Sequence, residues 1–253
     1  AGAAHWTNEL SRLEGLELES GEVLIAMSNH FFNSAEYGSR NRTNTQVVLD
    51  LYRTFLQRDP DPAESAYWAD SIAQGIPLGV ILASFQFSPE FEELVRAHLG
   101  PIGARTEGSL VLDFYRGFLN RLPESEGLEH WISHFGADLC TNFDAFAAQV
   151  ATIAEYFPDS PEYVSRNRSN QEFVGDLYSV FMRRSPESDG LAYFSQQLDG
   201  GASRASVRQA FLNSDEFQQR LAAAFREGCF QPNAPQAQVT SFAPNTAASG
   251  SRR

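Results

Sequence analysis

Acidic side chains gather in three short loops of this sequence, and carboxylate oxygens are the ligands that Ca²⁺ prefers. The first loop carries Asp59, Asp61 and Glu64. An EF-hand loop needs oxygen ligands at alternating positions over about twelve residues, a central glycine and a closing bidentate glutamate. Each loop here supplies only a few carboxylates, interrupted by proline. Two interpretations stay open: a partial calcium site, and acidic residues that stabilise the start of a helix.

Two basic clusters occur in an otherwise acidic chain, both within the tetrapeptide Ser-Arg-Asn-Arg. The first contains Arg40 and Arg42, and the second contains Arg166 and Arg168. Guanidinium groups bind anions through paired hydrogen bonds, so these clusters predict a binding site for an anion or an acidic sugar. The alternative is a turn between helices in which the arginines pair with neighbouring Asp or Glu.

Signatures of catalysis are absent from the sequence. It contains no G-x-S-x-G and no H-E-x-x-H, and its five histidines have no recognisable spacing to either cysteine. All 19 basic residues are arginine, which excludes a catalytic lysine, a Schiff base and a P-loop. We therefore expect a protein that is not an enzyme and that needs no cofactor, unless calcium binds to the acidic loops.

The elements that must position these residues are copies of one repeat, with a step of 63 residues. Aromatic, aspartate, arginine and proline columns recur at this step, which is the signature of a repeat protein. Large aromatic residues at one step are expected to form the core of each copy, and the alternative is a row of sugar-stacking platforms. The predicted core residues are Tyr52, Phe55, Trp68, Tyr115, Phe118, Trp131, Tyr178, Phe181 and Phe194.

Periodicity within a copy is helical. Apolar residues from Val48 to Leu56 fall on one stripe of an amphipathic helix, which is expected to stop before Arg58 because Pro60 follows. A second helix carries Trp68, a third runs from about Leu78 to Phe87, and a serine is placed to cap a fourth. No sustained alternation of period two occurs. The sequence therefore predicts an all-α fold of tandem helical repeats, with about four helices in each copy.

The closing motif F-x-x-S-x-E-[FY] occurs four times, although the leading helix occurs only three times. His5 and Trp6 match His130 and Trp131, so the chain begins with a half copy that lacks a leading helix. Residues 34–91 align with residues 160–217 without a gap, which indicates duplication of a two-repeat block. The predicted organisation is a half repeat at 1–42, full repeats at 43–107, 108–170 and 171–229, and a Pro/Ala/Ser-rich tail at 230–253.

Charge and cysteine content restrict the partners. The net charge of −13 makes nucleic acid and anionic lipid poor partners. No apolar run reaches the ~18–20 residues needed to span a bilayer. Cys140 and Cys229 lack the spacing of a metal site, and they are either one disulfide bridge or two independent thiols.

The repeated segment YRTFLQRDPDPAESAYWADSI, with its closing FQFSPEF, resembles the family called DUF4214, and more distantly the repeats of phycobilisome rod linkers. The family pattern is roughly Y-R-x-x-L-x-R-x-P-D-x-x-G-x-x-Y-W. This chain departs from it where Leu122 and Ser185 replace the acidic residue before proline and Phe194 replaces tryptophan. The resemblance implies a small helical module of exported bacterial proteins, often beside polysaccharide-active or calcium-binding domains. It brings no catalytic residues.

These observations predict a non-catalytic interaction or scaffold protein, located outside a bacterial cell, that binds a polysaccharide or a protein partner. The alternative is a self-assembling structural subunit of a filament or surface layer. A half copy without its leading helix is expected to expose apolar surface that a neighbouring chain covers.

Overall fold

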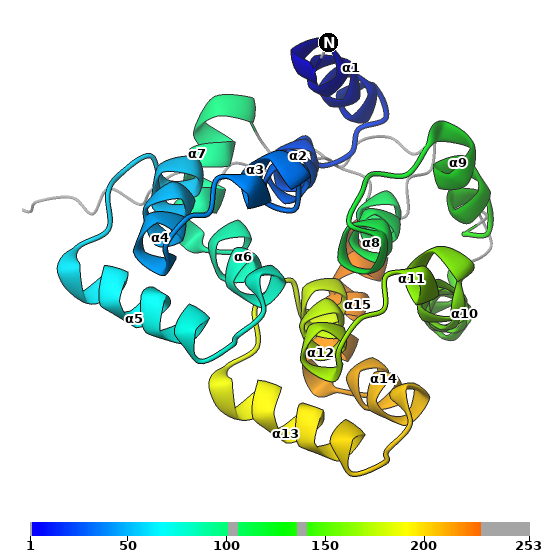
Figure 1. Cartoon of the computed structure of the whole chain (residues 1–253). Helices are drawn as coiled ribbons and strands as arrows, with labels where there is room; N and C mark the ends of the chain where they lie inside the picture. The colour runs from blue at the N-terminus through cyan, green and yellow to red at the C-terminus, as the bar shows by residue number, and fades with distance from the viewer. Residues whose placement is uncertain (1, 101–105, 136–140, 229–253) are drawn as a thin grey trace, which may run out of the picture.

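The computed structural model describes residues 2–100, 106–135 and 141–228, and every regular element in these ranges is helical (Figure 1). The absence of strands from these ranges confirms the predicted all-α class. No helix within them is long and apolar enough to cross a bilayer. The half copy contains α1 (Gly2–Gly15), α2 (Gly21–Phe32) and α3 (Ala35–Ser39).

The later copies have the helix order that the sequence predicts, beginning each time with a leading helix. The second copy contains α4 (Asn44–Leu51), η1 (Tyr52–Leu56), α5 (Pro62–Ala73), α6 (Leu78–Gln86) and α7 (Pro89–Leu99). The third contains α8 (Thr106–Phe114), η2 (Tyr115–Leu119), α9 (Ser125–Ser133), α10 (Phe143–Asp159) and α11 (Pro161–Ser165). The fourth contains α12 (Asn170–Leu177), η4 (Tyr178–Met182), α13 (Ser188–Asp199), α14 (Arg204–Leu212) and α15 (Asp215–Gly228).

Two of the leading helices begin with a reciprocal cap. The Thr43 hydroxyl accepts a hydrogen bond from the backbone N–H of Gln46, whose side chain accepts one from the N–H of Thr43. Ser169 and Glu172 do the same at the start of α12. A cap of this kind contributes about 1 kcal/mol, because it pairs backbone N–H groups that have no partner within the helix. The apolar stripe that follows is buried in the second copy: Val48, Leu51, Tyr52, Phe55 and Leu56.

Each leading helix closes with one π-helical turn and then a left-handed residue. The φ angles are +54° at Gln57, +58° at Asn120 and +50° at Arg183. A left-handed residue cannot continue a right-handed helix, so it sets the end of the element before the proline is reached. The cost of this conformation is small for asparagine and larger for arginine, which makes Arg183 an unusual occupant.

A serine caps the last helix of every copy, as the sequence predicts. The hydroxyl oxygen accepts from the backbone N–H three residues later, and the O–H donates to the carbonyl of the motif phenylalanine. The serine side chain therefore fixes the turn that precedes the last helix of each copy. The four serines are Ser34, Ser88, Ser160 and Ser214.

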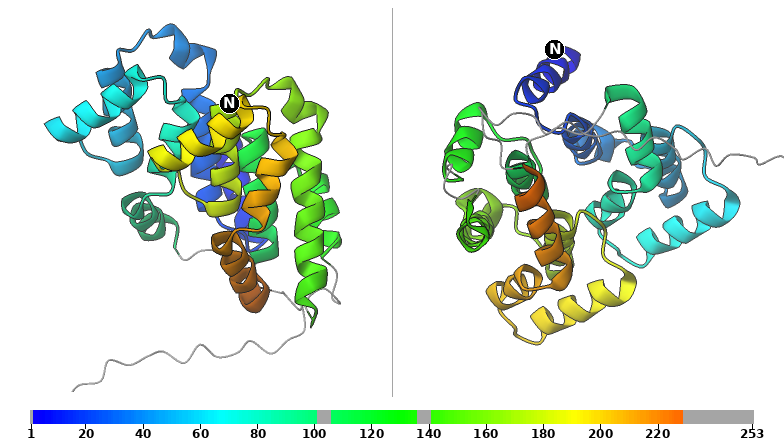
Figure 2. Two further views of the ribbon diagram at one scale, coloured as in Figure 1. Left: turned by 90° about the horizontal axis from the view of Figure 1, so that it is seen from below. Right: turned by 180° about the vertical axis from the view of Figure 1, so that it is seen from behind.

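The described core consists of two apolar clusters. The smaller cluster joins α2 of the half copy to α4, η1, α6 and α7, with Phe32 stacked on Phe55 at 6.1 Å between ring centroids. The larger cluster contains the third and fourth copies together with Leu13 of α1 and Val80 of α6. Figure 2 shows the two groups of helices side by side, with α2 between them. The half copy therefore contributes to both clusters.

Candidate functional site

Each complete copy contains the same arginine clamp, in which the arginine after the leading helix holds two carboxylates and covers a tyrosine ring. Arg58 donates to Glu64 at 2.9 Å and to Glu90 at 2.8 Å, and its guanidinium lies 4.9 Å from the Tyr52 ring centroid. The other two clamps are Arg121 with Glu124, Glu162 and Tyr115, and Arg184 with Glu187, Glu216 and Tyr178. The clamp joins the acidic loop to the closing motif and explains why both carry carboxylates.

The carboxylates of the first acidic loop already have partners within the chain. Asp59 accepts from Arg53 at 2.7 Å, which lowers its pKa. Asp61 caps α5 by accepting from the N–H of Glu64, and Glu64 accepts from the N–H of Asp61. The hydrogen bond from Arg58 and the one from Asp61 lower the pKa of Glu64 to about 2. The described residues contain no group of three or more His, Cys, Asp or Glu side chains arranged to hold a metal ion.

The two Ser-Arg-Asn-Arg elements form turns whose arginines pair with the chain itself. Arg42 donates to Asp50 at 2.9 Å, and Arg168 donates to Asp176 at 2.7 Å. Arg40 pairs with Glu36 on the same turn, and Arg166 donates to the carbonyl of Phe118. This geometry is the one expected of the turn interpretation. Of the four predicted anion ligands, only Arg40 has a side chain that is more than half exposed.

The aromatic columns lie where a repeat core requires them, with seven of the nine predicted residues buried. Trp68 and Phe194 are half-buried. The column tyrosine packs edge-to-face on the motif phenylalanine in every complete copy, at 5.1 Å for Tyr52 and Phe85. The corresponding pairs are Tyr115 with Phe157 and Tyr178 with Phe211, both at 4.9 Å.

The residue before the tryptophan column points outward in every copy. Tyr67 is 65% exposed and Tyr193 is 60% exposed. Each ring lies edge-on to its half-buried neighbour, Trp68 or Phe194, at 5.0 Å between centroids. The other two copies carry exposed histidines at this position, His5 and His130, each against a tryptophan.

A central ion cluster joins the half copy to the third and fourth copies in the interior. It consists of Glu19, Glu22, Asp113, Arg116, Arg183 and Arg220.

Geometry within the cluster is close and reciprocal. Arg116 donates to Glu22 at 2.6 Å and to Asp113 at 2.5 Å. Arg183 donates to Asp113 at 2.9 Å, to Glu22 at 3.0 Å and to Glu19 at 2.7 Å. Arg220 donates to the second oxygen of Asp113. Three carboxylates therefore face three guanidinium groups, and the cluster neutralises itself.

Two buried aspartates of the same column respond in opposite directions to their surroundings. Burial raises the pKa of Asp113, but Arg220, Arg183 and Arg116 outweigh it and lower the pKa to about 2. Burial raises the pKa of Asp176, and the opposing effects of Arg168, Arg166 and the Tyr163 hydroxyl do not compensate. The pKa values of these two equivalent aspartates therefore shift in opposite directions, because three arginines surround Asp113 and fewer surround Asp176.

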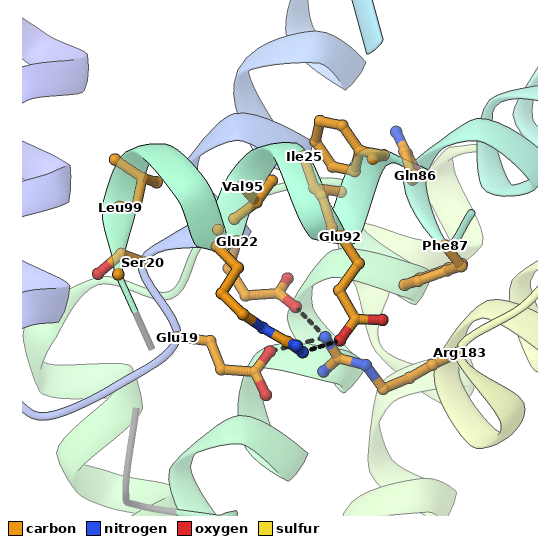
Figure 3. A pocket seen from close by; sticks show the side chains of 14 residues that line it. Glu19, Ser20, Glu22, Ile25, Gln86, Phe87, Glu92, Val95, Leu99 and Arg183 are labelled. Atoms are coloured by element: carbon orange, nitrogen blue, oxygen red, sulfur yellow. Dashed lines mark hydrogen bonds and ion pairs between the residues drawn. The ribbon is translucent and has the colours of Figure 1, made fainter. Parts of the chain in front are cut away.

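A pocket of about 280 Å³ opens beside the central ion cluster, between α2 and α7 (Figure 3). Ile25, Val95 and Leu99 supply apolar wall, and Glu22 and Arg183 supply the charged end. The carboxylate of Glu22 is almost wholly buried, and its Oε2 has no hydrogen-bond partner. Buried acceptors of this kind normally find a donor, so this end of the pocket suits the hydrogen-bond donor of a small ligand or a water molecule.

The sequence profile described as Domain of unknown function (DUF4214) matches residues 25–95 and 154–221. Together the two matches cover more than half of the sequence. This chain belongs to the DUF4214 family. Each DUF4214 match begins in the helix that precedes the closing serine of one copy, α2 or α10, and ends in the last helix of the next copy, α7 or α15, consistent with tandem copies and with the predicted two-repeat block. Comparison with curated proteins and with solved structures gave no match.

Sequence reasoning missed the central ion cluster of this DUF4214 protein, although one signal pointed to it. Arg183 stands in a column that holds Gln57 and Asn120 in the other copies, whereas the column of Arg116 also holds Arg53. A residue that differs from the others in its column makes no contact that all copies share, so it is available for contacts between copies. Glu22, the carboxylate partner of both Arg116 and Arg183, lies far from them in sequence, so the periodicity of the repeat cannot indicate these contacts.

The two cysteines predicted as a disulfide pair, Cys140 and Cys229, lie outside the described residues, as does the tail at 230–253. Their pairing stays a prediction.

Proposed function

We propose that this DUF4214 protein is a non-catalytic interaction protein that works outside the cell and binds an extended polysaccharide. The observation that carries the proposal is the repeated exposed ring of Tyr67 and Tyr193, on α5 and α13. A sugar ring presents a C–H face that packs well on an aromatic face, and a ring held against a second aromatic loses little freedom on binding.

Because the exposed tyrosine is repeated, the two rings together form a candidate binding site for a polymer. Each sits at the same place in its copy, 126 residues apart in sequence. Two weak contacts on one rigid body reinforce each other when one chain of sugars reaches both, because the second contact becomes intramolecular. The arginine clamps and the buried cores serve as the support that fixes both rings.

The test is a glycan array followed by titration calorimetry, in buffers with calcium and with chelator. We expect Tyr67→Ala and Tyr193→Ala each to weaken binding severalfold, and the double variant to lose more than the product of the two. Tyr156→Ala is the matched control, since Tyr156 is also exposed but lies on α10, outside this repeated position. A protein that binds no glycan, or a double variant that binds like the wild type, would reject the proposal.

A second candidate is the self-assembling structural subunit, and one observation favours it. Phe31, on α2, is 55% exposed, so a large apolar ring faces solvent on the described surface. Light scattering after size exclusion tests this candidate. Oligomers that Phe31→Ala dissolves would support it, and a monomer at all accessible concentrations would reject it.

A further inference from the structure

A carboxylate oxygen without a donor lies at the charged end of the pocket between α2 and α7 (Figure 3). Glu22 is 1% exposed, and Arg116 at 2.6 Å and Arg183 at 3.0 Å both donate to its Oε1. The other oxygen, Oε2, is buried and accepts no hydrogen bond from the described residues. A buried, charged acceptor without a donor is unfavourable, so a donor that comes from outside the chain gains by binding there.

The rest of the pocket is mostly apolar. Ile25 of α2 and Phe91 of α7 are buried, and Val95 and Leu99 of α7 are half-buried. The volume of about 280 Å³ lies just below the range of about 300–1,000 Å³ that is usual for small-molecule sites. The pocket therefore suits a small molecule with a short apolar body and a single polar end.

The charges around Glu22 favour a cation over a neutral donor. Arg183 donates to Glu19 at 2.7 Å and divides its remaining hydrogen bonds between two other carboxylates. Burial raises the pKa of Glu19, and Arg183 does not compensate. The neighbouring carboxylates of Glu22 and Asp113 raise this pKa further. An additional positive charge would therefore stabilise this side of the central ion cluster, and the net charge of −13 attracts cations to the protein.

The solvent side of the pocket carries one exposed ion pair. Arg96 donates to Glu92 at 2.6 Å, and the two side chains are 58% and 57% exposed. Figure 3 shows Glu92 lying over the same end of the pocket as Arg183. An exposed pair of long side chains is weakly held, so these two can move aside and open the way to Glu22.

We propose that this pocket binds a small primary ammonium ion that carries a short aliphatic body. The ammonium group donates to Oε2 of Glu22, and the aliphatic body packs on Ile25, Val95 and Leu99. A compact ammonium with three donors suits a single free oxygen, whereas a planar guanidinium pairs best with both oxygens of a carboxylate. A carboxylate ligand would place a second acceptor against Oε2. The site lies apart from the exposed tyrosines of α5 and α13, so it does not depend on glycan binding.

The experiment titrates the isotope-labelled full chain at pH 7 with hexylammonium, 1-hexanol and hexanoate, and it follows the backbone amide shifts by NMR. The three probes have the same chain length and differ only in the polar end. We expect saturable shifts on α2 and α7 with hexylammonium. Its affinity should exceed that of 1-hexanol by at least about tenfold, because a charge-assisted hydrogen bond is the stronger one. Hexanoate should show no saturable shifts.

Two tryptophan variants on α7 test the place of binding without altering the central ion cluster. Leu99→Trp fills the apolar wall, so it should weaken hexylammonium at least about tenfold. Ala97→Trp is the matched control, because Ala97 is exposed on the same helix and does not line the pocket. It should leave the affinity unchanged.

Glu22→Gln tests the charge. It should reduce the preference for hexylammonium over 1-hexanol to about threefold or less, because the amide oxygen still accepts a hydrogen bond but carries no charge. Glu22 also pairs with Arg116, so the urea midpoint of this variant is measured first. If Glu22→Gln does not fold, the tryptophan pair and the three probes decide the question.

Four results would overturn the proposal. Absence of saturable hexylammonium binding would show that water suffices at Oε2. Equal affinities for hexylammonium and 1-hexanol, or saturable binding of hexanoate, would remove the requirement for a cation. Wild-type affinity in Leu99→Trp would place the ligand elsewhere on the protein.

Discussion

The arginine clamps and the central ion cluster use the same chemistry in opposite settings. The clamp occurs in three copies, and each clamp lies partly in solvent and joins residues of one copy. The central ion cluster occurs once among the described residues, is largely buried and joins residues of three copies. Exposed ion pairs contribute little because water and salt screen them, whereas a buried charge left without its partner is very costly. The clamps therefore shape each copy, and the cluster decides how the copies fit together.

Removal of the carboxylate at the centre of the cluster should have the largest effect. Asp113→Ala leaves three arginines facing one another with two carboxylates, so we expect a loss of about 3–5 kcal/mol in the free energy of unfolding. Urea denaturation followed by circular dichroism measures it. A loss below about 1 kcal/mol would place the cluster in the same class as the clamps.

Acid should destabilise the protein through the cluster. The pKa of Asp113 is about 2, below the ordinary value near 3.9, so its contribution is fully present above about pH 4 and is lost as the pH falls through 2. The expected loss is on the order of 2 kcal/mol. Glu19 opposes it, because burial raises its pKa despite Arg183 and the folded protein gains when it is protonated.

The column itself supplies the control for the acid experiment. Asp113→Asn should flatten the dependence of the urea midpoint on pH between 4 and 2. Asp176→Asn should not flatten it, because the pKa of Asp176 is raised and its protonation favours the folded state. Equal slopes in the two variants would remove the distinction drawn between the two aspartates.

Loss of one clamp should be a small effect. Arg184→Met keeps the apolar stem over Tyr178 and removes two partly exposed ion pairs and a cation–π contact, so we expect a loss of about 1 kcal/mol. Arg96→Met is the matched control: it removes the exposed pair with Glu92 on α7, which is worth about 0.3–0.5 kcal/mol. A thermal melt of both variants beside the wild type is sufficient. A loss for Arg184→Met as large as that for Asp113→Ala would contradict the comparison.

Salt should have the smallest of these effects, and it should weaken a clamp more than it weakens the central ion cluster. At 1 M NaCl the screening length is about 3 Å, so the cost of Arg184→Met should shrink toward its cation–π part, while the cost of Asp113→Ala should change little. The measurement is the urea series repeated at 0.1 M and 1 M NaCl. If salt reduces both costs in equal proportion, the cluster is open to water.

Much of the helical order could be predicted because the same sequence pattern recurs in each copy of the repeat. The apolar stripe from Val48 to Leu56, the serine caps and the arginine column each depend on contacts within one copy, at fixed sequence separations. The turn interpretation of the Ser-Arg-Asn-Arg elements could be predicted for the same reason, because Arg42 and its partner Asp50 lie only eight positions apart in sequence. The π-helical turns were not predicted, because apolar spacing alone does not separate them from an α-helical end.

The sequence by itself determined the helical class, the step of the repeat and the family, because all of these are patterns of short range that recur. Only the tertiary structure decided that Glu22 meets Arg116 and Arg183, that Phe31 is the motif ring left in solvent, and that the acidic loops are occupied by arginines. The contacts of Glu22 with Arg116 and Arg183 join residues 94 and 161 positions apart, where no local propensity acts. Burial of apolar surface and pairing of charges together determine which residues of different copies meet, and both depend on how the copies pack.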